Sequence, residues 1–430
     1  MERLMHYVWQ HRLLLSDDLV TVDGQRVSII DPGRLNTDAG PDFFNAKIRI
    51  GSKLWAGDVE MHVRASDWHR HGHDGDPAYN SVILHVVDCD DTPIKRGDGE
   101  IIPQMVMRCA PDFSVKYDRL VGRSDIDLPC AYSFRETSSL HVTSWMAALG
   151  YERLYDKAAR LTALMDDHPG DWDHAVYVTL ARALGFGLNS LPMERLALAT
   201  PLAFMRKHSD SSVALEALLF GQGGFLNKEG VRGDDPYVDQ LSRRYAFLSH
   251  KFSLRPLDSP GWKMSRTRPQ NLPHRRLAVL AAFLADNFRP SARLLTMETP
   301  AEAIDYFRAP LSGYWANHYT LGGAASERAC ETMSEASARI LVINVVAPLL
   351  MAWGLSHGSD QHTVRARDWL EEMAPERNSI VGAFVSAGLP CRNAFDSQAL
   401  IQLRREYCEK HKCIYCRFGH RILSSHARRL

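Results

Sequence analysis

The chain has 430 residues, enough for two or three domains with separate cores, and its 45% hydrophobic and 24% charged residues are typical of a globular protein. Its 51 basic and 51 acidic residues give zero net charge, which excludes a nucleic-acid binder held by bulk positive charge alone. The first fifteen residues lack the cleavage site of a secretory signal, and no uninterrupted apolar run reaches the ~18 residues of a membrane span, so we expect a cytoplasmic protein with no membrane partner.

The first third of the chain, residues 1–135, predicts a mixed α/β domain. A helix is expected over 2–15, followed by a β-hairpin around Asp23-Gly24, a dipeptide that favours tight turns between strands. Further strands are expected near 43–50, 54–64, 81–87 and 101–108. A polar loop rich in His, Asp and Gly, at 69–77, separates the second and third of these.

The hydrophobic pattern of the sequence changes near residue 138, where long helical patterns separated by Gly and Pro begin. Residues 136–375 therefore predict an all-α domain. Within it, the segment 262–273 is too polar and too rich in proline for a helix interior. Its bases Arg266 and Arg268 are candidates for contacting nucleic-acid phosphates, with an ordinary surface connection as the alternative. Residues 376–430 form a third, cysteine-containing segment.

Two neighbouring strands around a short turn at 51–52 carry Asp42 and Glu60. Because side chains alternate along a strand, Glu60 and His62 share a face. A regular two-residue turn puts Asp42 on the opposite face, whereas a three-residue turn, or a β-bulge, brings it to the same face. We expect the three-residue turn or a bulge.

With that register, Asp42 and Glu60 could share a Mg²⁺ or Mn²⁺ ion, which polarises a phosphate oxygen and activates a water molecule. His62 would orient or deprotonate that water, and Arg64 would neutralise developing negative charge. The alternative is a surface hairpin whose acidic side chains face water.

Asp42 before a strand, followed by Glu60-x-His62 at the end of the next, resembles the PD-(D/E)XK nuclease superfamily. The resemblance implies a central mixed sheet flanked by helices, with Asp42 and Glu60 as metal ligands. His62 stands where that superfamily usually carries lysine. Because histidine is mostly neutral at pH 7, a constant positive charge would have to come from Arg64 or Lys47.

A second resemblance extends along nearly the whole chain. The segments GPDFFNA, GDVEMHVRASDWHRHGHD, ALLFGQGGFL, RTRPQNLP and YCEKHKCIYCRFG are together similar to a bacterial family, domain of unknown function 2851. This resemblance implies membership in that family and no particular activity.

The loop at 69–77 is dense in possible metal ligands. His69, His71 and His73, with His85 from the next strand, could bind a transition metal, as in many hydrolases and oxygenases. The alternative is a solvated loop whose histidines contact nucleic acid or nothing. His69 or His73 could also assist the site at Asp42 and Glu60.

Four of the eight cysteines lie late in the chain. Their spacing, C-x16-C-x4-C-x2-C, favours a zinc ion or a 4Fe–4S cluster over disulfides in a cytoplasmic protein. The candidate ligands are Cys391, Cys408, Cys413 and Cys416, and Cys130 is the main alternative for the fourth. Reduced thiols without a metal are the other alternative. Nucleases of the superfamily named above include members with a terminal cysteine cluster that holds the chain ends together.

These patterns together predict a mixed-sheet, nuclease-like N-terminal domain, a large all-α domain and a C-terminal cysteine-bound metal module. The function we expect is a metal-dependent nuclease that hydrolyses phosphodiester bonds of DNA or RNA. One alternative is a non-catalytic nucleic-acid-binding or scaffold protein with a degenerate nuclease fold. Another is a metallohydrolase centred on the histidine loop.

Overall fold

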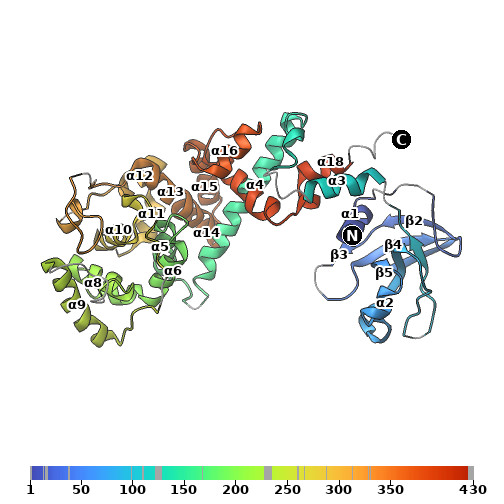
Figure 1. Cartoon of the computed structure of the whole chain (residues 1–430), viewed down its shortest axis with the longest axis horizontal. Helices are drawn as coiled ribbons and strands as arrows, with labels where there is room; N and C mark the ends of the chain where they lie inside the picture. Colours follow the sequence, from blue (N-terminus) through green and yellow to red (C-terminus); the bar gives the residue numbers. More distant parts are fainter. Residues whose placement is uncertain are drawn as a thin grey trace. The chain divides into compact units, whose positions relative to one another are not determined.

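A computed structural model of the chain describes residues 2–424, apart from 13, 15–17, 37–38, 98, 109–110, 122–127, 167, 227–234, 259–260, 266, 287, 312, 328 and 330. The chain forms two compact units (Figure 1). The α/β unit combines residues 1–139 with 404–430, and the helical unit comprises residues 140–403. The predicted third segment, 376–430, is therefore divided between the two units instead of forming a module of its own.

The α/β unit is built around a seven-stranded mixed sheet, which confirms the mixed-sheet prediction for the N-terminal region. Its strands are β1 (Leu19–Val20), β2 (Arg26–Asp31), β3 (Arg34–Leu35), β4 (Phe43–Ile50), β5 (Lys53–Arg64), β6 (Val82–Cys89) and β7 (Gln104–Val106). The strand order is β1-β2-β4-β5-β6-β7, and β3 pairs with β4. Strands β1 to β5 pair in antiparallel fashion, whereas β5, β6 and β7 are parallel.

The two faces of the sheet bury different sets of side chains. Val59 and Met61 of β5 pack in a core with α1 (Glu2–Gln10), the shortened form of the helix predicted over 2–15. Because side chains alternate along a strand, Glu60 and His62 lie on the opposite face. That face is covered by the 65–81 segment, which contains α2 (Asp67–Arg70) and two 3-10 turns, η1 (His73–Gly75) and η2 (Pro77–Tyr79).

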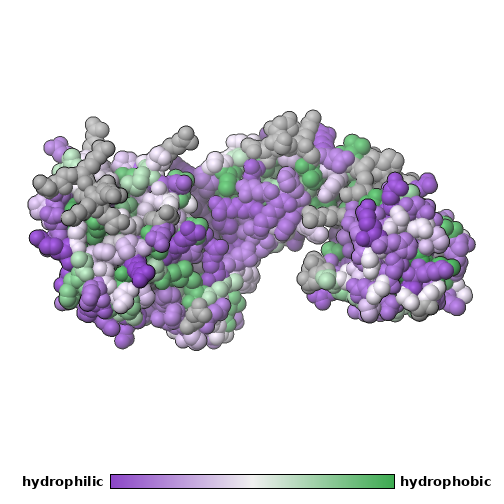
Figure 2. All heavy atoms as spheres, turned by 60° about the horizontal axis from the view of Figure 1, so that its bottom comes forward, coloured by the Kyte–Doolittle hydropathy of each residue, from purple (hydrophilic) through white to green (hydrophobic). Residues whose placement is uncertain are grey.

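The C-terminal segment returns to the α/β unit after the helical unit is complete. Helix α18 (Arg417–Ser424) lies beside α3 (Pro111–Val121), as Figure 1 shows. Ile422 and Leu423 of α18 contribute to the same core as α1 and the sheet. The chain passes from the helical unit back into the α/β unit within the π-helical turn η7 (Leu403–Cys408). The 3-10 turn η8 (Cys413–Tyr415) follows. On the face seen in Figure 2, the α/β unit, at the right, is mostly hydrophilic with scattered hydrophobic side chains.

The helical unit has one large core of its own, formed by apolar faces of most of its helices. The helices are α4 (Ser139–Ala163), α5 (Trp172–Leu184), α6 (Ser190–Ala199), α7 (Leu202–Arg206), α8 (Ser212–Gln222), α9 (Pro236–Phe252), α10 (Pro273–Asp286), α11 (Pro290–Thr296), α12 (Pro300–Phe307), α13 (Glu335–Leu341), α14 (Ala347–His357), α15 (Asp360–Glu372), α16 (Ser379–Ser386) and α17 (Ala394–Gln402).

A π-helical turn, η6 (Val342–Val346), joins α13 to α14 and makes one continuous helical stretch. By length and composition alone this stretch, Glu335–His357, is the one described helix that could cross a membrane, and 72% of its apolar window is buried inside the protein. Burial of that extent is typical of a helix in the core of a protein.

Candidate functional site

A β-bulge in β4 sets the position of the first predicted acid. Ile50 pairs with Lys53, so the hairpin turn has two residues and the expected three-residue turn is wrong. The bulge alternative is confirmed, because the β4–β5 register shifts between Phe43 and Ala46. The extra residue is accommodated by Asn45, whose φ of +55° lies in the left-handed region that Asn tolerates better than most residues.

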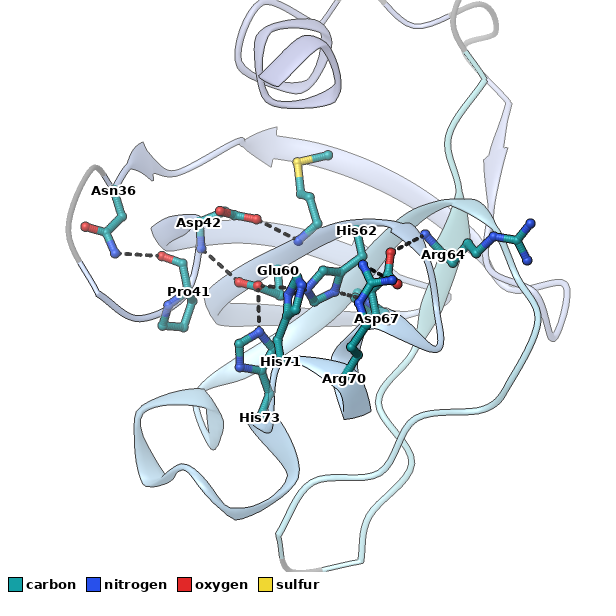
Figure 3. Close-up of polar contacts among 12 residues, drawn as sticks. Asn36, Pro41, Asp42, Glu60, His62, Arg64, Asp67, Arg70, His71 and His73 are labelled. Carbon is teal, nitrogen blue, oxygen red and sulfur yellow. Dashed lines mark hydrogen bonds and ion pairs between the residues drawn. The ribbon is translucent and has the colours of Figure 1, made fainter. Parts of the chain in front are cut away.

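Beyond the bulge, the two predicted acids lie side by side at the start of β4 and near the end of β5 (Figure 3). The Asp42 backbone N–H donates to Glu60 Oε2 at 3.0 Å, and the Met61 N–H donates to Asp42 Oδ2 at 2.9 Å. His6 of α1 approaches the same Asp42 oxygen, with Nε2 at 3.1 Å. Each carboxylate is therefore held by the backbone of the neighbouring strand.

Two histidines lie against the Glu60 side chain, and a third lies beside them. Glu60 Oε1 lies 3.5 Å from His62 Nε2 and 3.4 Å from His73 Nε2. His62 Nε2 is in turn 3.1 Å from His71 Nδ1. The ligand nitrogens of His62, His71 and His73 all lie within 4.8 Å of one another. Figure 3 shows these imidazoles and Glu60 gathered over one end of β5.

The loop after β5 brings His71 and His73 over the strand. Helix α2 ends next to Gly72, whose φ of +77° reverses the chain so that η1 runs back toward the sheet. The His73 ring stacks on Tyr79 with a centroid distance of 3.7 Å and makes an edge contact with Trp68 at 5.3 Å. These aromatic contacts fix the His73 ring from two sides.

His85 lies behind the trio, on β6, where it pairs in register with Glu60 of the parallel strand β5. Its Nε2 is 2.9 Å from His62 Nδ1, and the side chain is completely buried. His85 Nδ1 has no hydrogen-bond partner among the described atoms. A cation on His62 Nε2 would leave the His62 proton on Nδ1, which would then donate to His85 Nε2. His85 thus contacts the candidate ligand His62, but its own nitrogens do not belong to the group formed by His62, His71 and His73.

Burial controls the charge of these groups. It lowers the pKa of His62 to about 2 and of His85 to about 3, and repulsion from neighbouring imidazoles acts in the same direction. The pKa of His73 is lowered for the same two reasons, burial first. Burial, followed by the charge of Asp42, raises the pKa of Glu60. His62, His73 and His85 are therefore neutral at pH 7, which leaves one unprotonated nitrogen on each. His71, the remaining member of the trio, is exposed.

Neutral imidazoles beside a carboxylate are a donor set that fits a divalent transition metal such as Zn²⁺ or Mn²⁺. The fit rests on the mutual distances of the three nitrogens and on the position of Glu60 Oε1 beside two of them. The sequence predicted a site at Asp42 and Glu60 and another in the histidine loop, with His69 or His73 as a possible contributor to the first. Of these two histidines, the structure places His73 beside Glu60. The structure brings residues of both together in one place.

Two predicted residues point elsewhere. Arg64 has its contacts away from the trio. Its backbone N–H donates to Asp67 Oδ2 at 3.2 Å, and its guanidinium lies 3.7 Å from the Asp91 carboxylate. Figure 3 shows that guanidinium directed away from the histidines. His69 is exposed and pairs with Asp74 at 2.8 Å.

Two residues that the sequence analysis did not select, His6 and Tyr79, contact the site. His6 lies in the predicted N-terminal helix and reaches Asp42, and Tyr79 stacks on His73. No sequence spacing connects either residue with its partner. Only the polar loop between α2 and β6, with its own histidines, marked the general region.

The predicted nucleic-acid contacts lie in the helical unit. Arg266 falls outside the described residues, and Arg268 is exposed. Arg268 lines an open cavity of about 250 Å³ together with Asn189 and Asn271. The Asn189 amide is bonded to the Lys263 backbone and Asn271 Oδ1 accepts from Arg276, so the exposed Arg268 guanidinium is the group of the three that is placed to contact a ligand. None of these groups belongs to the histidine site.

The predicted cysteine ligands fall in both units. Cys408, Cys413 and Cys416 belong to the α/β unit, as does the alternative fourth ligand, Cys130. Cys391 belongs to the helical unit, where its sulfur lies 3.9 Å from the Asn393 carbonyl oxygen.

Comparisons with known proteins give a family and no activity. No curated protein and no solved structure shows significant similarity to the chain. One family profile, described as a protein of unknown function, DUF2851, matches residues 2–379, a range that includes the sheet, the acids and all the site histidines. The chain belongs to the DUF2851 family.

Proposed function

We propose that this protein is a metal-dependent hydrolase of phosphodiester bonds in nucleic acid. In this proposal His62, His71 and His73 hold a divalent cation, and Glu60 accepts a proton from the attacking water. The observation that carries the proposal is the convergence of three imidazole nitrogens within 4.8 Å beside a buried carboxylate.

The charge state of the ligands supports metal binding. Since burial keeps His62 and His73 neutral at pH 7, no proton has to be removed from them before a cation binds. A bound divalent cation supplies Lewis-acid chemistry, because it polarises a phosphate oxygen and lowers the pKa of water. The His62–His85 hydrogen bond fixes the ring orientation, as second partners of metal-bound histidines commonly do.

Glu60 is placed to act as the base. Its Oε2 is held by the Asp42 N–H, whereas Oε1 faces His62 and His73. Burial and the nearby charge of Asp42 raise its pKa to about 9, so without a cation Glu60 holds its proton at pH 7. The charge of a bound cation would lower that pKa and would leave the ionised carboxylate free to accept a proton from water. Asp42 is fixed by the Met61 N–H, and its own N–H positions Glu60.

A phosphodiester substrate is supported by the positive charge beside the site. Arg70, at the end of α2, is 71% exposed and close enough to His62 to influence its pKa. It is anchored by Asp67 at 2.9 Å, so that its free donors project into solvent near the trio. A guanidinium in this position suits a phosphate, and its charge stabilises negative charge that develops there.

The test combines metal binding with hydrolysis. Mn²⁺, Zn²⁺ and Mg²⁺ are titrated into purified protein by calorimetry, and cleavage of labelled DNA, RNA and bis-p-nitrophenyl phosphate is followed. The double variant His71→Asn, His73→Asn should lose both cation binding and cleavage. Glu60→Gln should keep binding but lower kcat by about 10²–10⁴-fold, the usual contribution of a general base. His69→Asn, in the same loop but paired with Asp74, is the matched control and should behave as the wild type.

Cleavage that survives the double variant would show that the activity belongs to another site. Cation binding without hydrolysis of any of the three substrates would contradict the hydrolase proposal and favour a non-catalytic metal-binding protein.

A further inference from the structure

A second group of metal-ligand side chains lies apart from the histidine site, at the C-terminal end of the α/β unit. Cys130 and Cys413 pack against the same hydrophobic core, and Cys413 and Cys416 lie at the two ends of a 3-10 turn that closely follows Cys408. The charge of any one of these thiolates would raise the pKa of its neighbours. The fold brings them together although Cys130 is separated from the others in sequence by the whole helical unit.

The three C-terminal cysteines are placed by two consecutive tight turns. The Lys412 N–H donates to the Tyr407 carbonyl at 2.8 Å, and His411 has a φ of +50°, so the chain reverses directly after Cys408. The 3-10 turn η8 follows, and the Cys416 N–H donates to the Cys413 carbonyl at 3.2 Å. This Cys-x-x-Cys turn brings its two sulfurs to one side, as metal-binding turns do.

Cys130 is held against these turns by contacts on its C-terminal side. Its carbonyl accepts hydrogen bonds from the N–H and the hydroxyl of Ser133, the last residue of the 3-10 turn η3 (Ala131–Ser133). Phe134 then packs on Phe418 of α18, with ring centroids 4.8 Å apart. Arg421 donates to the Glu136 carbonyl at 2.8 Å. The Cys130 segment and α18 are thus joined at several points beside the four thiols.

The surroundings of the sulfurs are largely apolar. Cys416 is only 6% exposed, and Cys130 and Cys413 pack against the core that contains Ile414 and Ile422. Four half-buried or buried thiols in one place are unusual unless a disulfide or a metal joins them.

We propose that Cys130, Cys408, Cys413 and Cys416 together bind one metal centre, either a zinc ion or an iron–sulfur cluster. This assignment replaces Cys391 by Cys130 as the fourth ligand. Among the described residues, only the histidine trio brings three ligand atoms within 4.8 Å of one another, so no three of the four sulfurs lie that close together. A tetrahedral zinc site and a 4Fe–4S cluster both take four thiolates, so these residues fit either group.

The position of the ligands gives the centre a structural role. Cys130 lies shortly before the helical unit begins at Leu140, and Cys408 lies shortly after the chain re-enters the α/β unit at Arg404. A shared metal would therefore link the two chain segments of the α/β unit that precede and follow the inserted helical unit. Linking segments so far apart in sequence constrains the unfolded chain strongly, which favours the folded state.

The test uses the full chain purified without oxygen. Metal content is measured by mass spectrometry, and the visible spectrum distinguishes a coloured iron–sulfur cluster from colourless zinc. One zinc, or one cluster, per chain is expected at the cysteines, counted in the His71→Asn, His73→Asn background so that a cation at the histidine trio does not contribute. Cys130→Ser should lose most of that metal, whereas the matched control Cys391→Ser should keep it. Equal metal content in both variants, or loss only in Cys391→Ser, would overturn the assignment.

A measurement on the wild type avoids the question of whether a variant folds. Native protein is treated with a thiol-alkylating reagent, and the modified cysteines are mapped by mass spectrometry before and after denaturation with chelator. The exposed Cys89 should react at once, and the four proposed ligands only after denaturation with chelator. A disulfide among the four, or metal-free protein, would contradict the proposal. The outcome is independent of the proposed hydrolase, because His71→Asn, His73→Asn should retain this centre.

Discussion

The hydrogen bond between His62 and His85 is the contact that most directly prepares an imidazole for a cation. Replacing His85 with leucine removes the acceptor for His62 Nδ1–H and leaves that buried donor without a partner. We expect the affinity for Mn²⁺ or Zn²⁺ to fall about 10–100-fold, the usual effect of losing such an outer partner. His85→Gln keeps an acceptor in a similar place and should retain most of the affinity, as measured by calorimetry. Equal losses in both variants would point to packing instead of the hydrogen bond.

At the level of single residues, sequence alone identified most of the chemistry but not its grouping. Glu60, His62, His71 and His73 were all candidates, because their types and alternation favour metal binding. Their assignment to two sites followed from reading each segment separately. The contact of Glu60 with His73 depends on how the 65–81 segment folds over the sheet, and packing of Trp68 and Tyr79 decides that.

Among the elements, the bulge of β4 determines which face Asp42 occupies. Asn45 is exposed, so a substitution there tests backbone conformation with little effect on packing. Asn45→Val should destabilise the α/β unit by about 1–2 kcal/mol, because a β-branched residue is strained at a φ of +55°. Asn45→Gly should change the stability by only a few tenths of a kcal/mol. Denaturant unfolding compares the free energies of unfolding of the two variants. An Asn45→Val protein as stable as the wild type would show that the bulge can rearrange without loss of stability.

Helix α10 supplies a pH-dependent element in the helical unit. His274 lies at its N-terminal end against Phe225, with ring centroids 4.3 Å apart, and its Nδ1 has no partner within the described structure. Burial lowers its pKa to about 4, below the unfolded value of 6.5. The unfolded chain then binds the proton more readily, so this histidine favours folding above pH 6.5 and loses that contribution as the pH falls toward 4.

The expected acid destabilisation is at most about 3 kcal/mol, reduced by the remaining solvent exposure of the ring. Removing the titrating group by His274→Leu should flatten the decline in the unfolding temperature between pH 6.5 and 4.5, relative to the wild type. An unchanged pH profile would mean that His274 does not carry the effect.

The predicted elements agree with the observed ones where the pattern is local. The strands expected at 43–50 and 54–64 correspond closely to β4 and β5, and the turn between them was placed correctly. The turn length was not, because Gly51-Ser52 allows two registers and only the packing of both strands selects one. Helix α1 ends at Gln10, earlier than predicted, where the chain turns toward β1.

At the scale of the whole molecule, the chain is a discontinuous α/β unit interrupted by a helical one. The hydrophobic pattern of the sequence indicated that the helical region begins near residue 138. It could not show that residues 404–424 return to the α/β unit. That return depends on long-range packing of Ile414 and Ile422 beside α1 and the sheet. Cys130, as the alternative fourth ligand, was the single sequence feature that connected the two parts.

Because each unit has its own hydrophobic core, we expect two separable unfolding transitions. A ligand that binds only the folded state stabilises it by about 4 kcal/mol at a thousand times its dissociation constant, so removing the cysteine-bound metal should lower the transition of the α/β unit alone. Hydrogen exchange during stepwise heating assigns each transition, with peptides from β4 to β6 reporting one unit and peptides from α8 to α10 the other. His274→Leu should alter only the second, at acid pH. A single common transition, shifted both by metal removal and by His274→Leu, would show that the two units unfold together. The cysteine-bound metal would then stabilise the whole chain instead of the α/β unit alone.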